Sequence, residues 1–350
     1  MKKEKIAIGM SGGVDSSVAA ALLQKDGYEV IGVTMLLWDG ESKACDDAKK
    51  VCEKLGIEHH TVDFRAEFKS AVMDYFAKEY QNGRTPNPCI VCNRFLKFDA
   101  MQRFAESLGA EKIATGHYAK IEYDEHLSRY ILKSADAMQK DQTYVLYSLT
   151  QKQLSKTVMP LGNLQDKAET RRIAEQLGFD VANKADSMEI CFIPDGDYRG
   201  FIEEHTGKKC ESGDFVDASG NVLGRHSGII NYTIGQRKGL GITFGKPMFV
   251  TKIDADRNQV VLGEKGTEFS SELTADNLNF IPFEKLTKPR TVLAKVRYSA
   301  KPALATVIPE GENLVRVVFE GPQRAVTPGQ AVVFYDSEGD MVIGGGIIRN

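Results

Sequence analysis

The first 150 residues of the chain alternate short apolar runs with stretches in which apolar positions recur at helical spacing. The apolar runs predict strands, and the helical spacing predicts helices between them. The expected strands cover residues 5–9, 29–37, 58–63 and 112–115, and the expected helices cover residues 15–26, 45–55 and 97–108. Because strands and helices alternate, we predict a parallel, doubly wound sheet that binds ligands at the carboxyl ends of its strands.

From about residue 207 helical spacing becomes scarce, and short alternating strands are separated by turn residues. Strands are expected at residues 214–217, 248–254, 259–262, 291–298, 304–308, 314–319, 331–335 and 341–348. Prolines stand at the turns of the last stretch, as expected of a small barrel. We therefore predict a Rossmann-like α/β domain over residues 1–205, a small central β domain over 206–272 and a C-terminal β-barrel over 273–350.

Composition limits the location and the partners. With 42% hydrophobic and 27% charged residues, the chain is typical of a globular protein. No apolar run is long enough for a signal peptide or a membrane span, so we expect a cytoplasmic protein that does not bind membranes. A net charge of −3 argues against general nucleic-acid binding. A local basic surface is still compatible with it, because charges act within roughly 8–10 Å.

A glycine-rich turn joins the first expected strand to the first expected helix. Residues 11–16 have the sequence Ser-Gly-Gly-Val-Asp-Ser, and the glycines allow a close approach of the backbone to a ligand. Amides at the start of the following helix favour an anion there. The loop lacks Gly-Lys-Ser/Thr, so it is not a Walker loop. A simple helix-capping turn would not account for the whole six-residue pattern Ser-Gly-Gly-Val-Asp-Ser between a strand and a helix.

This loop resembles that of the PP-loop pyrophosphatases, which split ATP between the α and β phosphates and transfer AMP. The resemblance implies ATP, with Mg²⁺, as cofactor. It implies ATP contacts at Gly9, Met10, Ser11, Gly12, Gly13, Val14, Asp15, Ser16, Met35 and Gly116. Met35 would pack on adenine, although ordinary core packing explains a Met in a strand equally well. The motif leaves the acceptor open, since asparagine, GMP, NAD and argininosuccinate synthetases share it with tRNA-modifying enzymes.

Five further segments narrow the choice of acceptor. They cover residues 83–93, 114–119, 140–144, 187–193 and 232–241. Together they resemble the bacterial tRNA-specific 2-thiouridylases, in the same domain order and over essentially the whole chain. The resemblance implies a tRNA-uridine 2-sulfurtransferase that acts on the wobble uridine of tRNAs for lysine, glutamate and glutamine. Its sulphur would come from a cysteine desulfurase or a sulphur-relay protein.

The same resemblance implies contacts with the anticodon stem-loop. The matched positions are Asn87, Pro88, Cys89, His117, Lys140, Asp141, Gln142, Arg297, Tyr298 and Gln330. A lysine on phosphate beside an amide on a base edge is a usual division of roles, and Arg with Tyr can stack on an unstacked base. Each residue alone is also consistent with an ordinary solvated surface, and His117 with a buried, hydrogen-bonded histidine.

The six cysteines are too few for a disulfide scaffold, and their positions carry more information than their number. By resemblance, Cys191 carries a persulfide and Cys92 is the catalytic partner that releases the sulphur, leaving an internal disulfide. A lone cysteine is otherwise a small buried apolar side chain. We expect that role for Cys45 and Cys52, seven apart on one helical face, and assign none to Cys210.

Cys89 departs from the family pattern, in which many members have Asp at this position. Cys89, Cys92 and Cys191 could therefore hold a [4Fe-4S] cluster with one iron open to sulphide. A structural zinc site is disfavoured because no fourth ligand accompanies them. Family precedent favours the persulfide route.

Two other classes of function remain as alternatives. A PP-loop synthetase acting on a small molecule would use the loop but would leave the cysteines without a role. A non-catalytic RNA-binding module would retain the fold without ATP cleavage. Release of AMP and pyrophosphate with and without tRNA distinguishes the three.

Overall fold

The computed structural model describes residues 3–40, 42–184 and 189–350. Its N-terminal domain is built on a parallel sheet of β1 (Lys5–Gly9), β2 (Glu29–Leu36), β3 (Glu58–Asp63), β4 (Lys112–Ala114) and β7 (Thr157–Val158). The strand order is β3-β2-β1-β4-β7, with every pair parallel. The predicted doubly wound sheet is therefore confirmed. The order reverses between β1 and β4, and such a switch point is where ligands of this fold bind.

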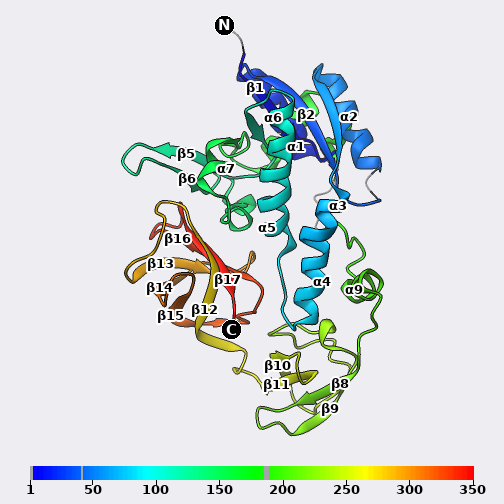
Figure 1. The fold of residues 1–350 in the computed structure, drawn as a ribbon, viewed down its shortest axis with the longest axis vertical. Helices are drawn as coiled ribbons and strands as arrows, with labels where there is room; N and C mark the ends of the chain where they lie inside the picture. Colours follow the sequence, from blue (N-terminus) through cyan, green and yellow to red (C-terminus); the bar gives the residue numbers. More distant parts are fainter. Residues whose placement is uncertain (1–2, 41, 185–188) are drawn as a thin grey trace.

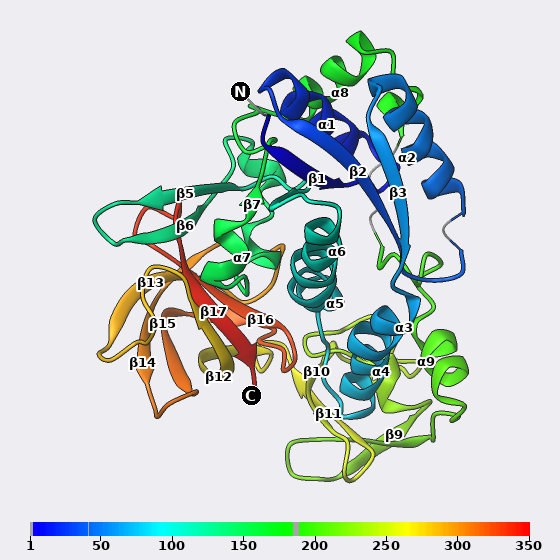
Figure 2. The same cartoon turned by 45° about the horizontal axis from the view of Figure 1, so that its top comes forward.

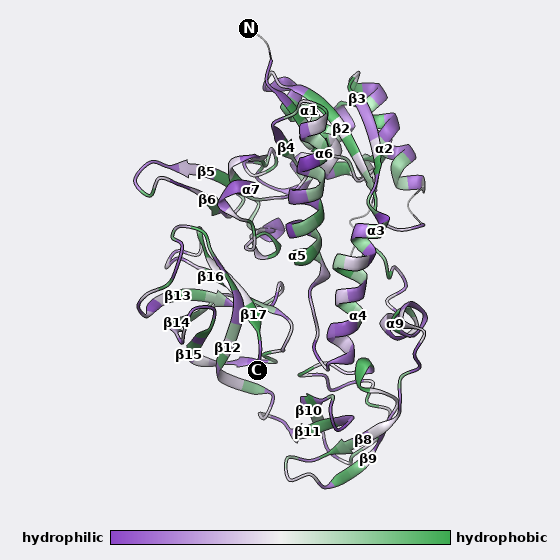
Figure 3. Cartoon of the chain, in the orientation of Figure 1, coloured by the Kyte–Doolittle hydropathy of each residue, from purple (hydrophilic) through white to green (hydrophobic). Residues whose placement is uncertain are grey.

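Both faces of the sheet are buried, as a parallel sheet requires. Along β1, Ile6 and Ile8 pack into one core and Ala7 into the other. The first core is covered by α1 (Val14–Lys25), α2 (Ser42–Leu55) and α8 (Lys167–Gln176). Figure 3 shows the contrast between the hydrophobic strand β2 and the mixed polar and apolar surface of α2.

A long helical column covers the other face. It consists of α5 (Pro88–Cys92), the π-helical segment η2 (Asn93–Ala100) and α6 (Met101–Ser107), and it runs from the sheet toward the middle of the molecule (Figure 1). The expected start at residue 97 is wrong, because Asn87 caps the column and its Oδ1 accepts a hydrogen bond from the Cys89 amide at 3.1 Å. Pro88 occupies the first helical position, where its missing N–H costs nothing.

The remaining elements of this domain surround the column. A second helical stretch precedes it, and a hairpin projects from the domain (Figure 2). These elements are α3 (Arg65–Phe68), η1 (Lys69–Met73), α4 (Asp74–Gln81), β5 (Lys120–Asp124), β6 (Arg129–Lys133), η3 (Met138–Lys140), η4 (Thr143–Val145), α7 (Gln151–Ser155), η5 (Asp180–Asn183) and α9 (Tyr198–Thr206). No helix within the described ranges combines the length and the apolar character needed to cross a bilayer.

The central domain is a four-stranded sheet in the order β10-β11-β8-β9. Its strands are β8 (Gly213–Val216), β9 (Val222–His226), β10 (Met248–Asp254) and β11 (Gln259–Glu264), with the short helix η6 (Ile229–Asn231) between β9 and β10. Phe215 lies at its centre, fully buried, with its ring edge-on to His226 and Tyr232.

The C-terminal strands close into a barrel in the order β12-β15-β14-β13-β16-β17, as predicted. They are β12 (Phe269–Phe280), β13 (Arg290–Lys295), β14 (Ala303–Pro309), β15 (Val315–Arg324), β16 (Ala331–Tyr335) and β17 (Val342–Ile348). Strand β12 was not predicted, because register shifts against both neighbouring strands interrupt its polar–apolar alternation.

Candidate active site

A pocket opens at the switch point of the parallel sheet, beyond the carboxyl ends of β1, β2 and β4. Seven of the ten residues expected to contact ATP line it: Gly9, Met10, Ser11, Asp15, Ser16, Met35 and Gly116. Two residues expected to contact tRNA, His117 and Gln142, line it as well. The pocket therefore brings together segments that the sequence analysis connected only by resemblance.

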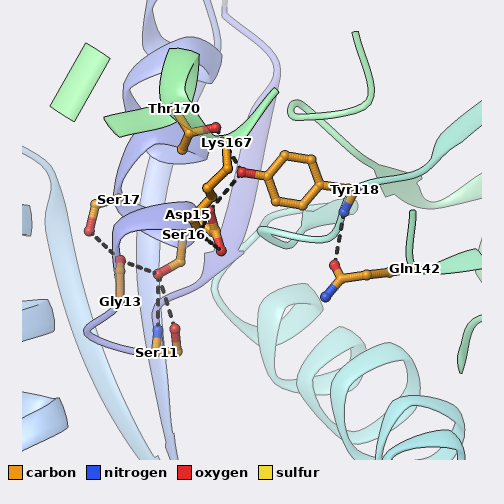
Figure 4. Close-up of polar contacts among 9 residues, drawn as sticks. All are labelled: Ser11, Gly13, Asp15, Ser16, Ser17, Tyr118, Gln142, Lys167 and Thr170. Atoms are coloured by element: carbon orange, nitrogen blue, oxygen red, sulfur yellow. Dashed lines mark hydrogen bonds and ion pairs between the residues drawn. The ribbon is translucent and has the colours of Figure 1, made fainter. Parts of the chain in front are cut away.

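The glycine-rich loop is held in its conformation by its own serines. Ser16 Oγ lies 3.3 Å from the Ser11 amide and donates to the Gly13 carbonyl at 3.2 Å, and Ser17 Oγ donates to the same carbonyl at 2.8 Å (Figure 4). Gly12 has a φ of 66°, and a Cβ atom there would collide with the Ala44 carbonyl. The loop thus ends at the N-terminus of α1, where the amides and the helix dipole favour an anion.

Gly116 allows the end of β4 to approach this loop. A Cβ atom at Gly116 would lie 2.7 Å from the Ser16 amide nitrogen. Any larger residue would push the two segments apart and widen the pocket. The glycine is therefore required for the packing that forms the site.

Asp15 is fixed by residues that the sequence analysis did not select. Lys167 Nζ lies 2.6 and 2.7 Å from its two carboxylate oxygens, and Tyr118 Oη donates to Oδ1 at 2.8 Å. Thr170 Oγ1 lies 2.7 Å from the same tyrosine oxygen. Figure 4 shows this chain of contacts joining the loop to α8. Lys167 and Thr170 lie some 150 residues from Asp15, so no local motif could have identified them.

Further pocket residues also escaped the sequence analysis. They are Thr34, Leu37, Ala44, Cys45, Lys97, Met101 and Thr115. Cys52 is buried as expected, and burial raises the pKa of its thiol to about 12. Cys45 was expected in the core as well, but it is half-buried and lines the pocket, because α2 turns this position toward the nucleotide loop.

His117 is buried beside the pocket, and its Nδ1 lies 2.8 Å from Thr115 Oγ1. Burial, together with the nearby charge of Lys97, lowers the pKa of His117 well below the usual value for histidine. The ring is therefore neutral at physiological pH and can exchange hydrogen bonds without bringing a charge to the site.

The thiols lie in different environments. Cys92 is buried in the helical column, whereas Cys89 and Cys191 are exposed. Beside Cys191, Phe192 is anchored edge-on against Phe68 and Phe76. Ser187 and Met188, part of the segment that carries the family resemblance, lie outside the described residues.

The cluster alternative requires Cys89, Cys92 and Cys191 to gather around one metal site. Within the described ranges, no group of three or more His, Cys, Asp or Glu side chains is placed to hold a metal ion. The three thiols therefore do not form a ligand set for an iron–sulphur cluster, and we derive no step through one.

The expected tRNA contacts fall into two groups. Asn87, Pro88, Cys89 and Lys140 lie at or next to helix starts and ends. In the second group, Tyr298 is exposed on the barrel, and its Oη donates to the Asp141 carbonyl at 3.2 Å. Asp141 accepts hydrogen bonds from the Ala135 amide at 3.2 Å and from Thr143 Oγ1 at 2.5 Å, and burial raises its pKa.

Three more of these side chains, Gln142, Arg297 and Gln330, also contact the protein. Gln142 Oε1 accepts from the Tyr118 amide at 3.0 Å, and Arg297 donates to the Arg324 carbonyl at 3.1 Å. Gln330 Nε2 donates to the Thr85 carbonyl at 2.7 Å. These side chains therefore also hold local structure.

The loop at residues 83–88, which leads into the helical column, joins all three domains. The Thr85 amide donates to the Pro328 carbonyl of the barrel at 2.9 Å, and Thr85 Oγ1 lies 3.4 Å from Thr233 Oγ1 of the central domain. Gly83 packs against Ile253 of the central sheet. The cysteines of α5 are consequently positioned by contacts from both β domains.

The strand order, the glycine-rich loop at the switch point and the pocket beside it define a nucleotide-binding domain of the PP-loop, ATP-using class. Family models agree with this class. The chain matches a tRNA methyl transferase HUP domain over residues 4–195, a tRNA methyl transferase PRC-barrel domain over 199–264 and an aminomethyltransferase beta-barrel domain over 270–348.

Full-length relatives narrow the class. The chain is 56% identical to the tRNA-specific 2-thiouridylase MnmA of Acetivibrio thermocellus, over 100% of both proteins. It is 53% identical to that of Clostridium acetobutylicum, over 99% of each chain, and 52% identical to that of Clostridioides difficile, over 99% of this chain and 98% of the relative. The chain belongs to the tRNA-specific 2-thiouridylase family. A solved NMN synthetase from Francisella tularensis aligns with 60% of this chain and 79% of its own, at 18% identity and a TM-score of 0.35, and supports no inference.

Proposed function

We propose that the protein is a tRNA-uridine 2-sulfurtransferase, which uses ATP to activate the C2 oxygen of the wobble uridine and replaces that oxygen with sulphur. The observation that carries the proposal is one continuous helix. Its Met101 packs against Gly9 at the nucleotide loop, and its other end carries Cys92. A nucleotide site and a thiol on one rigid element suit a reaction that first activates an oxygen and then delivers sulphur to the same carbon.

The first step transfers AMP. The C2 oxygen attacks the α phosphorus of ATP, an oxygen–phosphorus bond forms, and the bond to the β phosphate breaks. Pyrophosphate leaves with the electron pair, and the N3 proton is lost to water. The amides at the start of α1 are placed to hold the departing pyrophosphate. Mg²⁺ would neutralise phosphate charge. Phosphate oxygens and water would be its main ligands, and Asp15 is the carboxylate that lines the pocket.

The second step replaces oxygen with sulphur. The outer sulphur of a Cys191 persulfide attacks C2, and AMP leaves with the former uridine oxygen. The Cys92 thiolate then attacks Cys191 Sγ. The bond between Cys191 Sγ and the sulphur atom on C2 breaks, and that sulphur stays on the base. The base regains its N3 proton as 2-thiouridine. A Cys92–Cys191 disulfide remains, which an external dithiol reduces, and a cysteine desulfurase or relay protein reloads Cys191.

The proposed contacts with the anticodon stem-loop are those expected from the family. In this proposal Cys89 and His117 lie near the reacting base. The residues at 140–142 lie beside the pocket, and Tyr298 lies on the facing surface of the barrel. We place the domain boundaries near residues 205 and 272. The end of α9 at Thr206 and the separate sheets of β11 and β12 support them. We further propose that the enzyme works in the cytoplasm, where thiols are kept reduced.

The test is pyrophosphate release, measured with purified enzyme and ATP. Release that depends on a tRNA with an anticodon uridine is expected. Release with a small amide or carboxylate acceptor and without tRNA would show a synthetase instead. Absence of any ATP cleavage would leave only RNA binding.

The sulphur assignment is tested by Cys191→Ser. This variant should lose 2-thiouridine formation while it retains tRNA-dependent pyrophosphate release, because the activation step does not use the thiol. Cys210→Ser is the matched control and should thiolate normally. A Cys191→Ser enzyme with normal 2-thiouridine yield would contradict the persulfide assignment. Iron and sulphide assay after anaerobic purification tests the cluster alternative, which an iron-free, fully active enzyme would exclude.

A further inference from the structure

Lys97 brings a positive charge into the nucleotide pocket. Among the lining residues that the structure describes, it is the one side chain with a fixed positive charge, since His117 is neutral. Two acids near it already pair with other cations, Asp15 with Lys167 and Asp99 with Arg103. The charge of Lys97 is therefore available to a ligand, and the ligand of this pocket is a polyanion.

The helical column places Lys97 between the nucleotide loop and the thiol. Met101 packs against Gly9 at the end of β1, and Cys92 lies at the other end of η2. Lys97 stands between them, roughly 6 Å along the axis from Met101 and about 7.5 Å from Cys92 at 1.5 Å per residue. The C2 oxygen that receives the nucleotide and the C2 carbon that sulphur attacks are bonded to each other, so both must lie in the same interval.

The winding of η2 also affects which face Lys97 occupies. A π-helix pairs residues five apart, so positions 92 and 97 lie nearly one turn apart. In an α-helix, five residues correspond to about 1.4 turns, which would rotate Lys97 away from the face of Cys92. The irregular winding thus turns the lysine and the cysteine toward the same side of the column.

We propose that Lys97 is a catalytic residue of the activation step, whose ammonium group contacts a non-bridging oxygen of the α phosphate. This inference rests on the proposed function. As the uridine oxygen bonds to the α phosphorus and the bond to pyrophosphate breaks, negative charge grows on the non-bridging oxygens. The ammonium group stabilises that charge and keeps its own proton throughout. The amides of the glycine-rich loop remain responsible for the pyrophosphate.

The test compares Lys97→Gln, Lys97→Arg and the control Arg103→Gln, which removes an exposed cation from the same helix. Single-turnover pyrophosphate release is measured at saturating ATP and tRNA. Lys97→Gln should be about 10²–10³-fold slower, which is the usual loss for one charge-stabilising donor. Lys97→Arg should retain more activity, and Arg103→Gln should match the wild type. The Kd for tRNA should stay within about threefold in all variants.

A second measurement identifies the atom contacted. The wild type should discriminate between the two ATPαS diastereomers, and Lys97→Gln should lose at least about tenfold of that preference. A Lys97→Gln enzyme with the wild-type rate, with weaker tRNA binding alone, or with unchanged diastereomer preference would overturn the proposal. If Lys97→Gln fails to fold, Lys97→Met takes its place, with the same expected losses of rate and of diastereomer preference. A wild-type enzyme without tRNA-dependent release would instead reject the proposed function.

Discussion

Asp15 is the residue at which the nucleotide loop joins the rest of its domain. Its carboxylate is one-third exposed to the pocket and is held by Lys167, whose side chain is only 12% exposed. Replacing one partner of a partly buried ion pair leaves the other without compensation. Asp15 can therefore keep one orientation toward ATP only while Lys167 and Tyr118 hold it.

We expect Lys167→Gln to raise the KM for ATP about tenfold, because an amide donates one weaker hydrogen bond where the ammonium group satisfies both oxygens. The free energy of unfolding should fall by about 1–3 kcal/mol. Lys156→Gln, which removes the exposed pair with Glu106, is the control and should change neither value. An unchanged KM in Lys167→Gln would show that Asp15 needs no support from α8.

His226 provides a prediction about pH. It is buried in the central domain, where its Nδ1 accepts from the Gly228 amide at 3.0 Å and its Nε2 donates to the Asn258 carbonyl at 3.1 Å. Burial lowers its pKa. Below about pH 6.5 the unfolded chain therefore binds a proton that the folded domain rejects, so the stability contributed by neutral His226 is lost as the pH falls through this window.

The free energy of unfolding should consequently decrease between pH 7 and pH 5, with His226 contributing at most about 1.4 kcal/mol per pH unit. Urea unfolding of His226→Asn should show a smaller decrease than the wild type, although its stability at pH 7 is lower. His126→Asn, at an exposed position, serves as the control. Equal pH dependence in His226→Asn and wild type would contradict the assignment.

At the scale of single residues, the sequence predicted the glycine-rich loop, because local spacing determines a strand–turn–helix unit. It did not predict Lys167, Thr170 or Lys97. Their roles depend on which helices the fold brings against the loop, and that arrangement comes from tertiary packing rather than from neighbours in the chain.

Among the elements, the column of α5, η2 and α6 relates the nucleotide site to the thiol. Eight residues of π winding are unusual, since such windings are mostly single turns and occur frequently at functional sites. The sequence predicted a helix here but neither its true start nor its winding, because hydrophobic spacing does not separate π from α winding over so short a stretch.

Deletion of Phe95, which is 47% exposed, removes one residue from η2. With the winding of η2 retained, in which five residues make nearly one turn, the loss rotates Cys92 by roughly 80° about the column axis while Met101 still packs on Gly9. We expect ATP binding to persist and 2-thiouridine formation to fall at least about 100-fold. Phe95→Ala keeps the chain length and should remain active. An active deletion variant would show that the orientation of Cys92 relative to Met101 is unimportant.

At the scale of the whole molecule, the three domains meet at the loop formed by residues 83–88. Thr85 contacts the barrel at Pro328 and Gln330 and the central domain at Thr233. Hydrophobic patterning predicted the parallel sheet and the closed barrel, because each has its own periodicity and core. It could not predict these junction contacts, which involve polar side chains and backbone groups with no periodic pattern.

The central claim is that the C2 oxygen of the wobble uridine departs with AMP. It is tested most directly with tRNA that carries ¹⁸O at C2 of that uridine, incubated with the enzyme, ATP and a sulphur donor. Mass spectrometry of the released AMP should show one ¹⁸O atom for each 2-thiouridine formed. AMP without the label, accompanied by 2-thiouridine formation, would contradict the account.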